Sequence, residues 1–312
     1  MDILRRLAFI CSPFVGDSYM NTGDCIFVIV LTILVIIGIS LNLALLYMIV
    51  FKSPPTLTPY RIFLANTTIS QLLLSITSFI GQPRVLATPT HTIVIYLGPV
   101  QYLGEWLSYM VYLSSLHFSL NSFISLMLSM IYRYNSVKHR KFSSPQCYCI
   151  CLAGYSYCLI LLLSCAQIEV SRDEIINEPI VGNIVPDYRQ YNMINLLIFI
   201  SLITIGLIPI YVVMYWCRFR INKILMISTN IYNSTTKANA QRLVTALTIQ
   251  SIFPIASVFP SVFLYGLSQA KIIETGLYSY FIVPCITICT IVDPVVTAIC
   301  VIPYRRFILK IC

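Results

Sequence analysis

Residues 105–133 read EWLSYMVYLSSLHFSLNSFISLMLSMIYR, and this stretch decides the fold class. No residue between Glu105 and Arg133 carries a formal charge. A helix of this length, rising about 1.5 Å per residue, crosses the roughly 30 Å hydrocarbon core of a bilayer. Its hydroxyl groups and terminal arginine fall near one line along the helix, opposite large apolar side chains. The polar line comprises Ser115, Ser119, Ser122, Ser129 and Arg133, and the apolar side comprises Met110, Leu113, Leu120, Met127 and Ile131.

This polar line predicts a membrane-spanning helix at the centre of a bundle. A polar stripe within lipid needs protein or water in front of it, and small hydroxyl residues let neighbouring helices approach closely. The alternative is a span whose serines donate hydrogen bonds to carbonyl groups of their own helix.

The composition of the whole chain is that of an integral membrane protein. Of its 312 residues, 58% are hydrophobic and 10% are charged, whereas a soluble domain carries about 25% charged residues. Uncharged stretches predict an all-α fold, a seven-transmembrane helix bundle that forms a single domain over residues 1–312. The spans are expected near residues 26–50, 60–82, 104–134, 146–168, 192–217, 241–267 and 277–302, and a surface helix is expected at 303–312.

The uncharged segment 85–104 is predicted to be an outer loop that touches the membrane surface rather than an eighth span. It contains Pro89, Gly98 and Pro99, which are poorly suited to a helix interior. A helix there would also leave no polar turn before Glu105.

The charges of the connecting segments predict the orientation of the bundle. One set of alternating segments holds basic residues and no acidic residue: Lys52, Arg61, Arg133, Lys138, Arg140, Lys141, Arg218, Arg220, Lys223, Lys237, Arg242, Arg305, Arg306 and Lys310. By the positive-inside rule these segments and the C-terminus lie in the cytoplasm, and the N-terminus lies outside. The net charge of +9 reflects this bias, since the chain contains no nucleic-acid-binding motif.

The sequence predicts no cofactor and no metal site. Cys147, Cys149 and Cys151 form a C-x-C-x-C pattern, but the nearest further candidate ligand, His139, stands alone. Core thiols or S-acylation near the membrane surface are the expected roles of these cysteines.

Four ordered segments resemble the nematode serpentine chemoreceptors, most closely serpentine receptor class delta, within the rhodopsin-like superfamily of G-protein-coupled receptors. They are KSPPTLTPYRIFLANTTISQLL (52–73), LNSFISLMLSMIYRY (120–134), ALTIQSIFPIASVFPSVF (246–263) and IVDPVVTAICVIPYRRFI (291–308). The resemblance covers nearly the whole chain. It implies a chemosensory receptor in the plasma membrane of sensory neurons, at the cilium, with a role in olfaction. Such a receptor binds a small volatile or apolar chemical outside and activates a heterotrimeric G protein.

The resemblance assigns G-protein coupling to the inner ends of the third, fifth and sixth spans. Tyr132-Arg133-Tyr134 stands where rhodopsin-like receptors have Asp-Arg-Tyr. Because Arg133 lacks the acidic neighbour, we expect it to be restrained more weakly in the resting state. The residues expected to take part in coupling are Arg133, Tyr134, Arg218, Arg220, Lys237 and Arg242. The alternatives are a snorkelling side chain for Arg133 and contact with anionic inner-leaflet lipid for the other basic residues.

A second group of residues is predicted to form an activation switch. Asp293-Pro294 stands where rhodopsin-like receptors have Asn-Pro, and Gln71 stands where they usually keep an aspartate, while Asn42 matches their first span. A buried acid in the membrane costs roughly 2.5–3.5 kcal/mol unless it is protonated or hydrogen-bonded. We therefore predict that Asn42, Gln71 and Asp293 form one polar cluster beside Pro294, which acts as a hinge. The alternative is an Asp293 that reaches the inner interface by itself.

The ligand pocket is predicted by analogy in the outer halves of the third, fifth, sixth and seventh spans. Tyr112, Ser115 and Ser119 are expected to line it. The disulfide that usually braces the outer end of such receptors has no counterpart, because segment 169–189 contains no cysteine. We expect a less braced outer end, unless Cys11 and Cys25 pair.

The alternative function is a membrane transporter or channel subunit. Such proteins normally show repeats or several charges within the membrane, whereas only Asp293 is placed deeply here. A light-sensing receptor would need a lysine in 275–304, which contains none, and no pair of groups suited to an intramembrane enzyme is apparent. The expected partners are a small-molecule ligand, a heterotrimeric G protein and the lipid bilayer. The sequence leaves open whether the receptor forms an oligomer.

Overall fold

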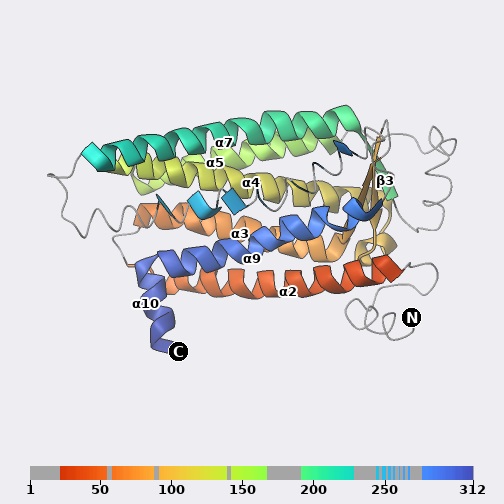
Figure 1. The fold of residues 1–312 in the computed structure, drawn as a ribbon, viewed down its shortest axis with the longest axis horizontal. Helices are drawn as coiled ribbons and strands as arrows, with labels where there is room; N and C mark the ends of the chain where they lie inside the picture. Colours follow the sequence, from red (N-terminus) through yellow and green to blue (C-terminus); the bar gives the residue numbers. More distant parts are fainter. Residues whose placement is uncertain are drawn as a thin grey trace.

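Long helices lie side by side in a bundle, and a small sheet caps one end (Figure 1). The computed structural model describes residues 22–54, 58–87, 91–138, 142–166, 191–227 and 276–311, with single residues between 244 and 267. The helices are α2 (Thr22–Phe51), α3 (Thr58–Gly81), α4 (Glu105–Val137), α5 (Ser144–Ala166), α7 (Leu196–Ile227), α9 (Ile282–Cys300) and α10 (Ile302–Ile311). The stretch quoted at the start forms most of α4, which packs against α3, α5 and α7 and so lies at the centre as predicted.

The described helices overlap the expected spans, except that residues 192–195 of the expected fifth span form a strand. Four of them are long and apolar enough to cross a membrane: Thr22–Phe51, Pro59–Gly81, Glu105–Val137 and Tyr278–Cys300. The expected sixth span, 241–267, is described only at single residues, so the total of seven spans and their membrane boundaries stay predictions. α7 starts at Leu196 and ends ten residues beyond the expected limit of 217, at Ile227.

A three-stranded sheet departs from the all-α prediction. β1 (Pro83–Ala87), β2 (His91–Tyr96) and β3 (Tyr191–Asn195) pair antiparallel in the order β1-β2-β3. As predicted, the segment 85–104 does not form a membrane-spanning helix. It is not a loop throughout, however, because much of it belongs to β1 and β2. Its sequence HTIVIY is rich in β-branched residues, which favour strands. We refer to this end of the bundle as the sheet end and to the opposite end as the α10 end.

Apolar residues of the β1–β2 hairpin fill the bundle at the sheet end. The side chains of Val85, Ile93 and Val94 pack in one cluster with Leu31 of α2 and Tyr112 of α4, all of them buried. Burial of this apolar surface favours the folded position of the hairpin by roughly 25 cal/mol per Å² removed from water. The hairpin thus covers the ends of the helices and fills the space between them.

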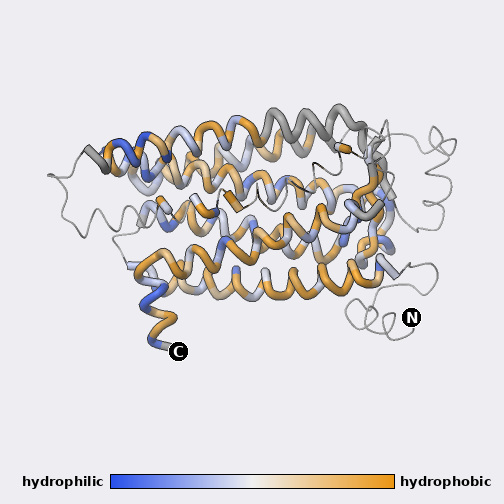
Figure 2. Tube along the Cα trace, viewed as in Figure 1, coloured by the Kyte–Doolittle hydropathy of each residue, from blue (hydrophilic) through white to orange (hydrophobic). Residues whose placement is uncertain are grey.

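Two features mark the other parts of the bundle. Figure 2 shows hydrophobic residues along most of the helix lengths, with hydrophilic residues at the α10 end of α7 and on α10.

α2 and α9 approach closely at Gly38, where an added Cβ would lie 2.6 Å from Thr290 Oγ1. Gly38 is therefore the residue that lets these two helices contact each other.

Candidate functional site

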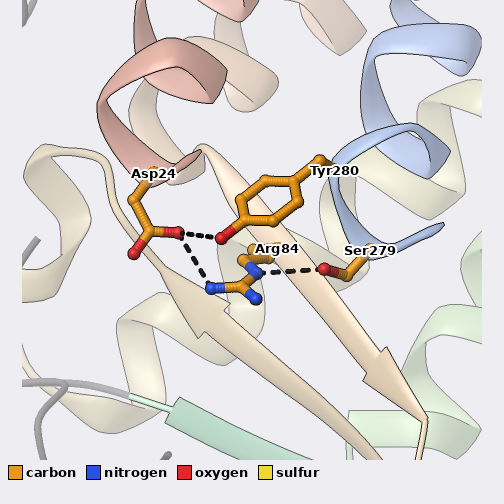
Figure 3. Close-up of polar contacts among 4 residues, drawn as sticks. All are labelled: Asp24, Arg84, Ser279 and Tyr280. Carbon is orange, nitrogen blue, oxygen red and sulfur yellow. Dashed lines mark hydrogen bonds and ion pairs between the residues drawn. The ribbon is translucent and has the colours of Figure 1, made fainter. Parts of the chain in front are cut away.

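At the sheet end, a buried ion pair joins three parts of the chain that are far apart in sequence (Figure 3). Asp24 lies in the first turn of α2, Arg84 lies on β1, and Ser279 and Tyr280 end the 3-10 helix η4 (Gly276–Tyr280) that precedes α9. Arg84 Nη1 lies 2.8 Å from Asp24 Oδ1, and Arg84 Nε donates to Ser279 Oγ at 3.0 Å. The Tyr280 hydroxyl donates to Asp24 Oδ1 at 3.0 Å. We call these four residues the Asp24–Arg84 cluster.

The cluster braces the sheet end without a disulfide. The guanidinium carbon of Arg84 lies 4.1 Å from the centre of the Tyr280 ring, so the cation is held by a ring as well as by a carboxylate. Asp24 and Ser279 are fully buried. The strands add a second connection, because β3, which directly precedes α7, pairs with β2. These contacts were not foreseen when a less braced outer end was predicted from the missing disulfide. The predicted alternative, a Cys11–Cys25 disulfide, stays untested because Cys11 lies outside the described residues.

The predicted pocket residues lie on α4 beneath the hairpin. Tyr112 and Ser115 are buried, and Ser119 is half-buried. Tyr112 packs in the same cluster as Tyr96 of β2. Ser115 donates to the Tyr112 carbonyl oxygen at 2.7 Å, so this serine bonds to its own helix. The structure thus places these residues together, and their role in ligand binding stays a prediction.

In the middle of the bundle, the structure brings together two of the three predicted cluster residues. Gln71 Nε2 donates to Asp293 Oδ2 and also reaches Ser122 Oγ at 3.3 Å, which joins α3, α9 and α4. Both Gln71 and Asp293 are buried. An amide donor on a buried carboxylate offsets part of the cost of removing that group from water.

Asn42, the third predicted residue, contacts the α9 backbone rather than either side chain. Its Nδ2 donates to the Thr290 and Gly38 carbonyl oxygens, both at 2.8 Å. Thr290 precedes Pro294 by four residues, and proline has no N–H to donate to that carbonyl. Asn42 therefore supplies the hydrogen bond that Pro294 removes from α9. Asn42 and the Gln71–Asp293 pair act on the same turn of α9 by different contacts.

Gln250, which was not among the residues predicted from the sequence, connects the sixth expected span to α9. Its Nε2 donates to the Asp293 carbonyl oxygen at 3.1 Å and to Thr297 Oγ1 at 2.9 Å. The carboxamide of Gln250, well inside the expected span, was the signal available in the sequence. Gln250 places the sixth span in contact with the predicted switch.

A small cavity lies beside this polar group. Its volume of about 20 Å³ is enough for one water molecule. Its lining includes Tyr60, Thr67, Gln71, Ser129, Gln250, Asp293 and Thr297. Asp293 Oδ1 is buried and has no hydrogen-bond partner among the residues that the structure describes. The site therefore combines an unsatisfied acceptor with space for a small polar group, next to the contacts between α9 and the sixth span.

Arg133 is held by an aromatic ring in place of an acid. Its guanidinium carbon lies 3.6 Å from the centre of the ring of Tyr60, a buried residue of α3. Tyr132, which replaces the usual aspartate, stacks on Tyr60 with ring centres 6.1 Å apart and also packs on Phe63. Arg133 Nε and Nη2 are buried, and neither has a partner within the described ranges. The restraint on Arg133 is thus a cation–π contact supported by stacked rings.

The other residues assigned to coupling separate into two groups. Tyr134 and Arg220 lie close together through Trp216, whose ring centre is 5.4 Å from that of Tyr134. Arg218 is half-buried and lies two residues after Trp216 on α7, and Lys237 and Arg242 lie outside the described residues. The structure therefore brings Tyr134 to α7 and Arg133 to α3.

Comparison with known proteins identifies several similar chains. A family model described as "Serpentine type 7TM GPCR chemoreceptor Srd" matches residues 27–310. The Caenorhabditis elegans serpentine receptor class delta-33 is 50% identical over 321 residues, with 100% of this chain and 94% of the relative covered. Serpentine receptor class delta-32 of the same organism is 35% identical, with coverage of 94% and 89%. The crystal structure of squid rhodopsin matches with a TM-score of 0.65 at 15% identity and covers 95% of this chain and 87% of that chain, which shows a common helical-bundle fold.

Proposed function

Since the chain belongs to the Srd family of serpentine seven-transmembrane chemoreceptors, we propose that it binds a small apolar or volatile chemical at its sheet end and activates a heterotrimeric G protein at its α10 end. Membership establishes a multi-pass membrane receptor of the G-protein-coupled type. The proposal adds the class of ligand, the surface used for coupling and a location in the ciliary membrane of sensory neurons. It also adopts the predicted orientation, with the α10 end in the cytoplasm.

The observation that carries the coupling proposal is the state of Arg133. Arg133 is partly exposed, but its Nε and Nη2 are buried and lack partners among the described residues, and unsatisfied buried donors on a charged group cost free energy. A carbonyl or carboxylate from another protein would satisfy them, and the planar guanidinium suits such an acceptor. The other residues proposed to take part in coupling are Arg218, Lys237 and Arg242.

The switch residues support a mechanism that moves the sixth span. Gln250 holds this span to α9 by two neutral hydrogen bonds, at Asp293 and Thr297. Each is worth about 1 kcal/mol net, so a ligand with a modest difference in affinity between two states can break them. Pro294 weakens α9 at the same place, which favours bending there.

The proposed ligand is small and largely apolar because of the surroundings of the predicted pocket residues. Tyr112 packs among apolar side chains, and the Ser115 hydroxyl is already used within α4. None of the predicted pocket residues Tyr112, Ser115 and Ser119 carries a charge that could pair with a charged ligand. This supports an uncharged odorant rather than a charged peptide.

The test is a functional screen in cells that carry a calcium or cyclic-nucleotide reporter. Cells that express the chain should respond to at least one member of a panel of volatile compounds, and Arg133→Ala should lose the response at equal surface expression. Arg306→Ala, which removes an exposed arginine of α10, is the matched control and should retain it. An equal response in Arg133→Ala cells, or ion conduction by the purified protein in bilayers, would refute the proposal.

A further inference from the structure

We propose that the α10 ends of α4 and α7 form a binding site for the phosphate group of an anionic phospholipid. The site consists of Tyr134 and Lys138 from α4 and Trp216 and Arg220 from α7, and we call it the α4–α7 basic cluster. Tyr134 and Arg220, which were predicted to take part in G-protein coupling, would instead bind lipid. It rests on the proposed function only through the orientation, which places this end at the cytoplasmic leaflet, where anionic lipids gather.

The geometry of the cluster brings two cations to one pair of aromatic rings. The rings of Tyr134 and Trp216 meet edge to face, with centres 5.4 Å apart. Lys138 Nζ lies 4.7 Å from the centre of the Tyr134 ring, and the guanidinium carbon of Arg220 lies 5.7 Å from that of Trp216. Two helices thus position two cations next to one pair of aromatic rings.

The charge of the cluster is not neutralised by its own segments. No aspartate or glutamate occurs between Tyr134 and Ala166 or between Leu196 and Lys271. Both Lys138 and Arg220 are exposed, so their outer faces can reach a further group. Paired cations with a hydroxyl donor match the charge and hydrogen-bonding capacity of a phosphate.

The surface above the cluster identifies that phosphate as part of a lipid. Ile208, Val212 and Trp216 follow one another at intervals of four residues on one face of α7, with exposed fractions of 57%, 63% and 52%. Arg220 continues the same row at the α10 end. An apolar row that ends in a tryptophan and then in a cation matches the acyl chains, the interface and the headgroup of one phospholipid. A soluble phosphate or an acidic peptide would match only the cations.

The chain contains its own reporter for this site. It has two tryptophans, Trp106 and Trp216, so Trp106→Phe leaves Trp216 as the single fluorophore. The Trp106→Phe protein is reconstituted in bilayers that contain phosphatidic acid or phosphatidylcholine with dibrominated acyl chains, which quench tryptophan on contact. The ratio of quenching by the two lipids measures the preference of the site for the anionic lipid.

The inference predicts a clear preference that depends on the two cations. Each cation near the membrane surface favours an anionic lipid by roughly fivefold, so we expect a preference of about 5- to 25-fold. Lys138→Gln/Arg220→Gln should bring it close to one, whereas the charge-preserving Lys138→Arg/Arg220→Lys should retain most of it. Arg305→Gln/Arg306→Gln removes the same charge from exposed positions on α10 and should leave it unchanged. Glycerol 3-phosphate, the headgroup without chains, should not compete.

Several outcomes would overturn the inference. They are a preference near one in the Trp106→Phe protein, an equal loss in the α10 variant, or displacement by glycerol 3-phosphate. If the Lys138→Gln/Arg220→Gln protein does not fold, as judged by its Trp216 emission in phosphatidylcholine, the salt dependence decides. The preference must then fall towards one in 1 M salt, where charges are screened within about 3 Å, and persistence would contradict a charge-based site. The assay uses neither odorant nor G protein, so a signalling receptor without the preference would refute this inference alone.

Discussion

Removal of the cation from the Asp24–Arg84 cluster should destabilise the sheet end strongly. Arg84→Met keeps a long side chain but removes the guanidinium that lies 2.8 Å from Asp24 Oδ1 and 4.1 Å from the centre of the Tyr280 ring. Asp24 is fully buried, so its carboxylate cannot gain water in compensation without a local opening. Removal of one partner of a buried ion pair typically costs about 3–5 kcal/mol.

The magnitude follows from the partners that remain. The Tyr280 hydroxyl still donates to Asp24, so this hydrogen bond to a charged group is kept. The lost contacts include the charge pair, the bond to Ser279 and the cation–π contact. At roughly 2 °C per kcal/mol for a chain of this size, a loss of about 3–5 kcal/mol lowers the unfolding midpoint by about 6–10 °C. Asp24→Leu/Arg84→Met removes both charges and should recover most of this loss.

The buried cysteines of the chain supply the assay. Cys147 and Cys158 are almost fully buried in α5, so a thiol-reactive fluorogenic dye reports their exposure as the purified protein is heated. Arg306→Met, which removes an exposed cation from α10, is the control and should change stability by less than about 0.5 kcal/mol. If Arg84→Met unfolds with the Arg306→Met protein, or if the double variant is no more stable than Arg84→Met, the assigned role of the ion pair is wrong.

Three further changes test other contacts. Tyr60→Leu removes the ring over Arg133, so ligand-independent reporter output should rise by up to about tenfold, whereas Tyr60→Phe keeps the ring and should stay near the parent level. Burial raises the pKa of Tyr96 well above its usual value, so the folded state holds this proton more tightly than the unfolded state and stability should fall as the pH rises above about 10. Tyr96→Phe should lessen that fall in the thiol assay, and an unchanged pH profile would contradict the assignment. Gly38→Ala places a Cβ 2.6 Å from Thr290 Oγ1 and should cost about 1–3 kcal/mol, and Thr290→Ala in the same chain should recover part of it.

Local patterns in the sequence predicted the helices and one contact of the site. The uncharged stretch between Glu105 and Arg133 predicted the central helix. Relative to rhodopsin-like receptors, Gln71 replaces an acid and Asp293 replaces an amide, and this paired replacement predicted their contact. These features repeat along one helix or follow from a charge that cannot lie alone in lipid. Such features can be predicted from the sequence because they depend only on neighbouring residues and on whether a segment lies in the membrane.

Contacts between distant segments could not be predicted in the same way. Arg84 and Asp24 are separated by sixty residues, and a count of charges on each side of the membrane gave no sign that they pair. Arg133 was expected to be weakly held because its acidic neighbour is missing, yet Tyr60 of α3 holds it by a different interaction. β1 and β2 were missed because the uncharged segment next to a span was judged by charge rather than by its β-branched residues. β3 was missed because residues 192–195 were predicted to begin the fifth span.

The beginning of α9, at the sheet end, is held more strongly than its middle, and this difference indicates which part moves. At the sheet end, Ser279 and Tyr280 join the buried Asp24–Arg84 pair, whose disruption costs several kcal/mol. In the middle, Gln250 holds α9 by neutral hydrogen bonds worth about 1 kcal/mol each, next to a proline. A ligand shifts an equilibrium only by its difference in affinity for the two states, which is seldom more than a few kcal/mol. We therefore propose that a small ligand changes the contacts around Gln250 while the sheet end stays fixed, and that bending at Pro294 transmits this change to the α10 end.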